Sequence, residues 1–385
     1  FSRGWPPALL RLPLWPIALV GGMLFWLLRE RTYHGDALLK LELLATESLA
    51  TDPYIWKEPL DAYLAHTAAS LLASIGQPPE TAVALLSILA GILYLWSALY
   101  LARLLGRSVW TGTVILVALL ATGSSQLWFG HIENYSLVTA VSIYATALAI
   151  GTLRGGLPLW PVGLAAGAAV SLHPQAAFTL PALLILLERD RWLKQIVVLF
   201  LTGLTVPLLT MAVLVLVGGV TPPWVATLAG EGYGGDTQLF LTFGQALAPY
   251  RLWQALNNLW LLVPLFPFWL VAGDCALVDH RTRRDRVLRY LAVLTAGLLL
   301  YFFTFQNDLP RWRDWDLYAI VGPSLTLWGI YAWLELMAVS NRWRGRMWPF
   351  LTTGLVFASL LVAAWIGVNA RYTLIRPTSE ERTLY

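Results

Sequence analysis

The sequence predicts an all-helical protein that crosses a membrane many times, and three observations predict this fold class. The 385-residue chain is 58% hydrophobic and only 12% charged, whereas soluble domains carry about 25% charged residues. Its apolar runs are continuous over about 15–25 residues, the length of a membrane-spanning helix, and do not alternate as barrel strands do. The 20 Trp and 15 Tyr residues fit aromatic belts at membrane interfaces. We therefore predict a polytopic transmembrane helical bundle forming a single membrane domain, 1–385.

Eleven segments have the length and apolarity expected of spans. In chain order they are 12–29, 81–102, 109–126, 135–153, 158–172, 176–188, 193–218, 257–278, 287–305, 316–338 and 347–368. The first has no small-residue cleavage site after it, so we interpret it as a retained anchor rather than a signal peptide. The pair on either side of His173-Pro174-Gln175 is short, and a dip that returns to the same side is an alternative to two full crossings.

The distribution of charge orients these spans. One side carries 16 of the 26 Lys and Arg residues and 6 of the 22 Asp and Glu residues, and the other carries 10 basic and 16 acidic residues. Basic residues concentrate on the cytoplasmic side of membrane proteins. We therefore predict an integral membrane protein with a cytoplasmic N-terminus and an extracytoplasmic C-terminus. Its expected location is a prokaryotic cell membrane.

Two long segments fall on the extracytoplasmic side, 30–80 and 219–256. Within the first, 37–49 is amphipathic, and 60–75 has only about two-thirds of a spanning length and contains Asp61. We predict that both are helices lying on the membrane interface. The second segment is rich in Gly and Pro, which predicts a mobile loop able to order over a ligand.

Polar residues on this side gather in four compact clusters at the ends of predicted spans. The clusters are His34-Gly35-Asp36, Trp56-Lys57-Glu58-Pro59, His131-Ile132-Glu133-Asn134-Tyr135 and Arg311-Trp312-Arg313-Asp314-Trp315-Asp316. Charged groups at membrane depth are costly and are often functional. The clusters therefore suggest a site for a polar or phosphorylated group carried by a lipid.

The first two clusters each have a functional and a structural interpretation. Asp36 is suited to act as a general base that deprotonates an acceptor hydroxyl, or to cap the helix that follows it. Lys57 is suited to hold a phosphate, with Glu58 orienting the lysine or the substrate. Pro59 is explained by its place in the first turn of a helix.

The remaining candidates leave similar alternatives open. His131 and Glu133 are spaced to bind a metal or to share an acid–histidine hydrogen bond, while Asn134 is suited to cap the next helix. His173 interrupts an apolar stretch, either as a packing residue or as a ligand.

The last cluster is the richest in charge. Arg311 and Arg313 offer fork-shaped donors suited to phosphate. Asp314 and Asp316 would pair with these arginines or face a sugar, and the alternative is a charged turn anchored by tryptophans.

Several chemistries have no support in the sequence. The chain contains no GxxxxGK[ST], HExxH, CxxC or GxSxG motif, so nucleotide hydrolysis, zinc proteolysis and serine hydrolase chemistry are not indicated. Its single cysteine, Cys275, cannot form an intramolecular disulfide. We assign no residue as a metal ligand at this point and expect no nucleic-acid partner.

The layout of spans and clusters resembles the GT-C superfamily of polytopic glycosyltransferases, especially the branch that uses polyprenyl-phosphate sugars. Members carry an essential acid in a first outer loop of two interfacial helices, the place that Gly35-Asp36 occupies here. Trp56-Lys57-Glu58-Pro59-Leu60 resembles the Lys-Pro motif of the protein mannosyltransferase and aminoarabinose transferase branch, with Glu58 inserted between Lys and Pro. The His131–Tyr135 and Arg313–Leu317 segments resemble motifs of bacterial members.

This resemblance implies an inverting transfer with a lipid phosphate as the leaving group. Asp36 would be the base, with Glu133 a second catalytic candidate. The phosphate would be held by Lys57, Arg311 and Arg313, and sugar or acceptor would be positioned by Glu58, His131 and Glu133. The implied partners are membrane lipids and a polyprenyl-phosphate-linked sugar, with a protein acceptor or partner subunits left open. No cofactor is assigned, and a divalent metal is left open.

Two other functions compete with this interpretation. A transporter or flippase of a lipid-linked or anionic solute would use the same outer charges, but the 197–217 and 291–305 runs contain no charged residue to line a path. A non-catalytic membrane subunit of a larger complex is the second alternative.

Overall fold

The computed structural model describes residues 13–30, 37–222, 240–305, 315–339 and 341–371. Over these ranges the chain is helical, and the β-type pairing they contain is an isolated bridge between Phe240 and Phe305. The all-helical fold class predicted from the apolar runs is therefore confirmed. The first part of the chain forms α2 (Trp15–Leu27), α3 (Ala37–Thr46), α4 (Pro59–Ala73), α5 (Pro79–Leu105), α6 (Val109–Leu120), η1 (Gly123–Trp128), α7 (Tyr135–Leu153) and α8 (Trp160–Leu172).

The second part of the chain adds the remaining helices of the bundle. It forms η2 (Pro174–Leu186), α9 (Trp192–Leu216), α11 (Phe243–Ala246), α12 (Pro249–Leu262), α13 (Phe266–Val278), α14 (Arg286–Thr304), η3 (Asp316–Tyr318), α15 (Val321–Val339) and α16 (Asn341–Arg371). Each of the eleven predicted spans overlaps at least one of these helices, so the positions of the apolar helical segments are confirmed.

Several of these helices are suited to a bilayer. In the described part of the chain, five are long and apolar enough to cross a membrane, namely α5, α7, α9, α14 and the Trp348–Arg371 part of α16. Four further apolar helices are shorter: α2, α6, α8 and η2. These helices make the chain an integral membrane protein, and the number of full crossings stays a prediction.

The predicted span 257–278 is not one continuous helix, and whether it crosses the membrane stays a prediction. Helices α12 and α13 meet at an angle of 91° across a short break. Val263 at the break has an extended backbone, with φ −139° and ψ 80°, and Pro264 follows it. Proline cannot donate a backbone hydrogen bond and disfavours helical geometry in the residue before it. The apolar run continues through this proline, so hydropathy alone hid the bend.

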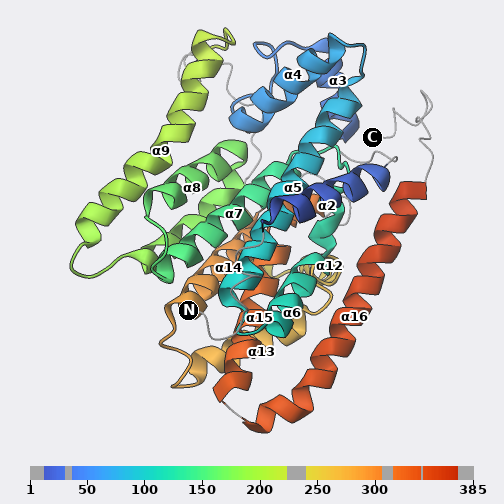
Figure 1. The fold of residues 1–385 in the computed structure, drawn as a ribbon. Coiled ribbons are helices and arrows are strands. Elements are labelled where there is room, and N and C mark those ends of the chain that lie inside the picture. The colour runs from blue at the N-terminus through green and yellow to red at the C-terminus, as the bar shows by residue number, and fades with distance from the viewer. Residues whose placement is uncertain (1–12, 31–36, 223–239, 306–314, 340, 372–385) are drawn as a thin grey trace.

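The bundle has a buried centre and exposed edges. Helix α15 is buried along nearly its whole length, and it packs between α13 and α14. Helix α9 is buried over only 6% of its apolar window and α16 over 28%, and both lie at the edges of the bundle (Figure 1). Apolar helices exposed in this way are suited to contact lipid.

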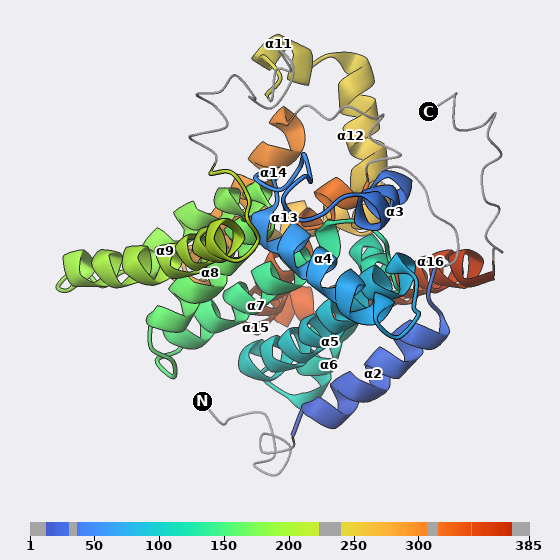
Figure 2. The same cartoon turned by 90° about the horizontal axis from the view of Figure 1, so that it is seen from above.

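The two short helices predicted in the first outer segment are present as α3 and α4. They lie together at one end of the bundle, seen at the top of Figure 1 and over its centre in Figure 2. Pro59 occupies the first position of α4, as predicted. We refer to this end of the molecule as the α3–α4 end. The predicted loop 219–256 is partly helical, because α11 and the first half of α12 fall within it.

Candidate functional site

Three segments far apart in the sequence bring acids and a histidine together at the α3–α4 end. Glu30 follows α2, His131 and Glu133 lie in the turn between η1 and α7, and Asp316 begins η3. All four residues are buried, with Asp316 only 1% exposed. We call these four residues the acid–histidine cluster.

The turn that carries His131 depends on Gly130. This glycine has φ +74°, a backbone conformation that other residues rarely adopt. A Cβ at this position would also lie 2.9 Å from the Cβ of Arg29. The backbone N–H of Glu30 donates to the carbonyl oxygen of Phe129 at 2.6 Å. The end of α2 is therefore joined directly to the turn before His131.

His131 lies between two carboxylates. Its Nδ1 is 2.8 Å from Oε2 of Glu30, and its Nε2 is 2.9 Å from Oδ2 of Asp316. Burial alone would lower the pKa of His131, but the charges and hydrogen bonds of the two carboxylates outweigh it and raise the pKa to about 10. The ring of Trp315 lies 5.4 Å from that of His131 and 4.7 Å from that of Trp365 on α16.

The same cluster has the donor set of a divalent metal site. One ligand atom from each of His131, Glu133 and Asp316 lies within 4.8 Å of the others. The carboxyl groups of Glu133 and Asp316 are thus buried close together, and two such acids are better satisfied by a shared proton or by a cation between them. Imidazole and carboxylate ligands suit Zn²⁺ and Mn²⁺. Glu30 would then orient the imidazole through Nδ1, a common arrangement at metal sites.

A second set of buried polar residues lies beside the first. Lys40 of α3 donates to the Asp61 carboxylate of α4 at 2.8 Å and also to the side-chain oxygen of Asn134. Asn134 in turn donates to Glu58, and the other oxygen of Glu58 is 3.2 Å from Nε2 of His173. We call these five residues the lysine–amide cluster. It joins α3 and α4 to the starts of α7 and η2.

The two acids of the lysine–amide cluster differ in their proton affinity. Burial would raise the pKa of Glu58, but the hydrogen bond and charge of His173, with the charges of Lys57 and Lys40, hold it below its ordinary value. Burial raises the pKa of Asp61 in spite of the nearby ammonium group of Lys40. Glu58 is therefore the more firmly ionised acid.

The structure brings five of the predicted site residues into these clusters. His131, Glu133 and Asp316 belong to the acid–histidine cluster, and Glu58 and His173 belong to the lysine–amide cluster. Lys57 is exposed, with its ammonium group 5.9 Å from the centre of the Tyr54 ring. The predicted residues Asp36, Arg311, Arg313 and Asp314 lie outside the described residues.

Three residues of the clusters were not predicted as site residues: Glu30, Lys40 and Asp61. Each is a charged residue at the edge of or within an apolar stretch, which is the signal that could have identified it. Asn134 was considered as a helix cap. It stands at the N-cap position of α7, but its side chain makes no capping hydrogen bond and instead joins Lys40 to Glu58.

Comparison with solved structures identifies the fold. The chain is similar to ArnT from Cupriavidus metallidurans in the apo state, with a TM-score of 0.52 and 16% identity over 91% of this chain and 62% of that one. For ArnT bound to undecaprenyl phosphate the TM-score is 0.51, with the same identity and coverage. The chain is also similar to an Archaeoglobus fulgidus oligosaccharyltransferase tethered with an acceptor peptide. The TM-score is 0.52, with 12% identity over 95% of this chain and 56% of that one.

Both neighbours are membrane glycosyltransferases of the GT-C superfamily. The chain therefore has the GT-C fold, and the resemblance predicted from the sequence is confirmed at the level of fold. This chain spans about three-fifths of the length of these neighbours. No family model and no curated protein sequence matches it.

Proposed function

We propose that the chain is a membrane glycosyltransferase that moves a sugar from a polyprenyl-phosphate donor to an acceptor at the extracytoplasmic face. The observation that carries this proposal is the buried acid–histidine cluster at the α3–α4 end of a GT-C fold. Charged groups are rarely buried at a membrane boundary without a functional role. The fold supports a glycosyltransferase, and the cluster supports a site for a phosphorylated or polyhydroxylated substrate.

We assign the general base to Asp36. This residue directly precedes Ala37, and Ala37 packs in one apolar group with Val83 and Ile132. Ile132 lies between His131 and Glu133, so the start of α3 is attached to the turn that carries the cluster. The base takes the proton from the acceptor hydroxyl as its oxygen forms a bond to the anomeric carbon. The bond from that carbon to the phosphate oxygen breaks, the polyprenyl phosphate leaves with the electron pair, and the anomeric centre inverts.

Basic residues near Asp316 are proposed to hold the phosphate. Arg313 stands three residues before Asp316 in the sequence, and three peptide units reach at most about 11 Å. Arg311 and Lys57 are further candidates, and Asp314 would orient the arginines. A divalent cation held by His131, Glu133 and Asp316 would supply positive charge for the same phosphate. Glu133 and Asp316 also offer acceptors for sugar hydroxyls. Glu58, which lies beside His173 and accepts a hydrogen bond from Asn134, would position the turn that carries the acid–histidine cluster.

The solved neighbours support this choice of donor class. One of them is described with undecaprenyl phosphate and the other with an acceptor peptide. We infer a lipid-phosphate donor for this chain as well, with a peptide or lipid acceptor. A translocation role has less support, because the centre of α9 is free of charged residues.

Turnover in proteoliposomes tests the proposal. Undecaprenyl-phosphate sugars are supplied with a membrane extract as the acceptor source, and released undecaprenyl phosphate is measured. The wild type should release it, and Asp36→Asn and Glu133→Gln should each slow release by roughly 10²–10⁴-fold. Asp190→Asn, an exposed acid beyond η2, serves as the control.

The outcomes separate the competing functions. Full activity in a folded Asp36→Asn variant would remove Asp36 from the mechanism. Binding of undecaprenyl phosphate without release from any donor would favour a flippase or a non-catalytic subunit.

A further inference from the structure

Helix α12 presents a row of apolar and aromatic side chains to its surroundings. The row consists of Tyr250, Trp253, Leu256 and Trp260, which are 60%, 67%, 40% and 52% exposed. Their spacing of three, three and four residues places them on one face of the helix. The opposite face is buried in the protein through Ala255, Asn258, Leu259 and Leu262. An apolar face of this size is unfavourable in water and marks a contact surface.

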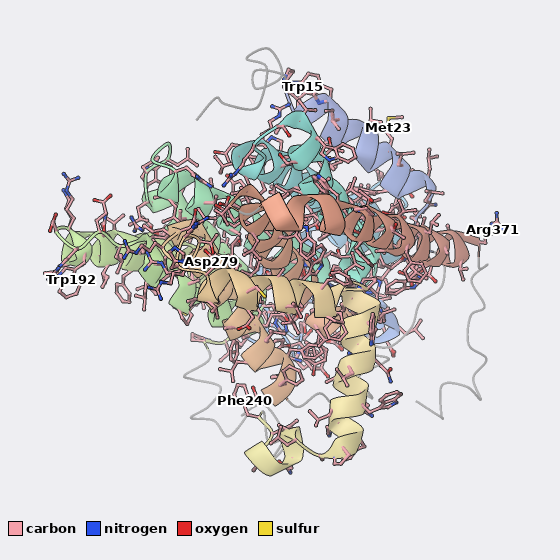
Figure 3. All side chains as sticks on the ribbon, turned by 90° about the horizontal axis from the view of Figure 1, so that it is seen from below. Trp15, Met23, Trp192, Phe240, Asp279 and Arg371 are labelled. Atoms are coloured by element: carbon pink, nitrogen blue, oxygen red, sulfur yellow. The ribbon has the colours of Figure 1, made fainter. Side chains whose placement is uncertain are left out.

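The direction of α12 differs from that of the helix it joins. Helix α13 packs along α15 in the apolar bundle, and α12 leaves it at 91°. Figure 3 shows this right-angle turn in the yellow ribbon that runs from Asp279 towards Phe240. With α13 directed along the bundle, α12 runs across it and therefore along the membrane plane.

Helix α12 is held tightly against the elements that carry the acid–histidine cluster. A Cβ at Gly123 of η1 would collide with the carbonyl oxygen of Leu261, and one at Gly322 of α15 would lie 3.4 Å from that of Leu262. Helix η1 leads into the turn with His131, and α15 follows η3 with Asp316. The depth of α12 in the membrane and the depth of the cluster are therefore fixed relative to each other.

We propose that α12 docks in the lipid interface of the leaflet at the α3–α4 end and sets the acid–histidine cluster at the level of the lipid phosphates. Tyr and Trp rings prefer this boundary between acyl chains and head groups, and an amphipathic helix lies there with its apolar face about 5–10 Å deep. Arg251, the charged residue of α12, lies beside the Tyr250 ring and is suited to a lipid phosphate.

Spin-label depth measurements test the docking independently of any enzymatic activity. The full chain carries Cys275→Ala so that a nitroxide can be attached at Trp253→Cys or Trp260→Cys, in phosphatidylcholine vesicles. Collisions with oxygen, which dissolves in lipid, and with a water-soluble nickel chelate should place both labels between two controls. The controls are Glu42→Cys on α3 and Leu208→Cys on α9, both at exposed positions.

Two results would overturn the docking. Labels as accessible to nickel as the Glu42→Cys control would place α12 in water. Labels shielded from both reagents would mean that protein, such as a second copy of the chain, covers the row.

Kinetics test the depth-setting role, which rests on the proposed function. The double variant Trp253→Ser/Trp260→Ser should raise the KM for an undecaprenyl-phosphate donor in vesicles by about tenfold, which corresponds to about 1.4 kcal/mol of lost interfacial binding. It should leave turnover of a short-chain donor in detergent unchanged.

Trp160→Ser/Trp192→Ser is the matched control, since both residues are similarly exposed at the start of α8 and α9. An unchanged KM in the first double variant would overturn the depth-setting role. Absence of turnover in the wild type would count against the proposed function, and the labels would still decide the docking.

Discussion

The acid–histidine cluster and the lysine–amide cluster are neighbours in the chain, since Glu133 belongs to one and Asn134 to the other, but their charges differ. In the lysine–amide cluster each acid has a basic partner, with Lys40 beside Asp61 and His173 beside Glu58. In the acid–histidine cluster three carboxyl groups surround one imidazole. One cluster has a basic side chain for each acid, and the other has three acids for one basic side chain.

This difference indicates a division of labour. A buried network in which each acid has a basic partner needs no added ligand or ion. It holds the helices that contribute to it in one arrangement. Three buried carboxyl groups around one imidazole are better satisfied by a proton, a cation or a polar ligand. We therefore expect changes in the lysine–amide cluster to act mainly on stability, and changes in the acid–histidine cluster to act mainly on ligand binding and turnover.

The largest effect on stability is expected from Lys40→Met. Methionine fills a similar volume but leaves Asp61 buried without its counter-charge. Breaking a buried ion pair on one side costs about 3–5 kcal/mol of unfolding free energy. Denaturant unfolding in detergent measures the change.

Lys194→Met is the matched control for this variant. Lys194 is exposed near the start of α9, away from both clusters, and a surface substitution of this kind changes stability by about 0.5 kcal/mol. Equal effects of the two variants would show that the lysine–amide cluster contributes no more to stability than a surface charge.

A smaller effect is expected when a divalent metal is added. Mn²⁺ or Zn²⁺ that binds the folded acid–histidine cluster at a hundred times its Kd would raise the unfolding free energy by about 2.7 kcal/mol. Asp316→Asn should abolish this stabilisation, and Glu42→Gln, at an exposed acid of α3, should retain it. If the metals stabilise both variants equally, they bind elsewhere, and the contrast between the clusters loses its chemical basis.

The smallest effect is a dependence of stability on pH. The pKa of Glu58 is held below its ordinary value of 4.5 in the folded protein. Glu58 therefore contributes stability above pH 4.5, and this contribution is lost as the pH falls through the folded-state pKa. Each unit by which the pKa is lowered corresponds to about 1.4 kcal/mol.

The pH dependence is checked by measuring unfolding at a series of acidic pH values. Glu58→Gln should destabilise the protein at neutral pH and flatten the acid limb of its stability curve. Glu47→Gln, at an exposed position, should leave that limb unchanged. Parallel curves for wild type and Glu58→Gln would show that the Glu58 carboxylate does not stabilise the fold.

The sequence predicted the fold class and three of the four residues of the acid–histidine cluster, but it did not predict which side chains pair. Long apolar runs determine helices locally, so the elements were found from hydropathy. His131, Glu133 and Asp316 were found because charged residues stand out at the ends of such runs. These three residues come together, and His131 contacts Glu30, because of how the helices pack. Local sequence periodicity does not predict helix packing.

Other residues were missed for the same physical reason. Lys40 and Asp61 look like the polar positions of two surface helices, and only the approach of α3 to α4 turns them into a buried pair. Lys57 shows the reverse case, since its place in a motif suggested the site while the described structure leaves it exposed. The roles of Asp36, Arg311, Arg313 and Asp314 stay predictions.

Gly130 has a consequence for the divergence of this chain over evolutionary time. Its positive φ and the nearby Cβ of Arg29 make other residues unfavourable for reasons of local geometry that do not depend on the site chemistry. Among homologous sequences, position 130 should remain glycine even where selection on chemistry has lapsed. A relative that retains this glycine but has lost His131 and Glu133 would be a folded descendant without the chemistry, whereas one that retains all three would be under selection for the reaction.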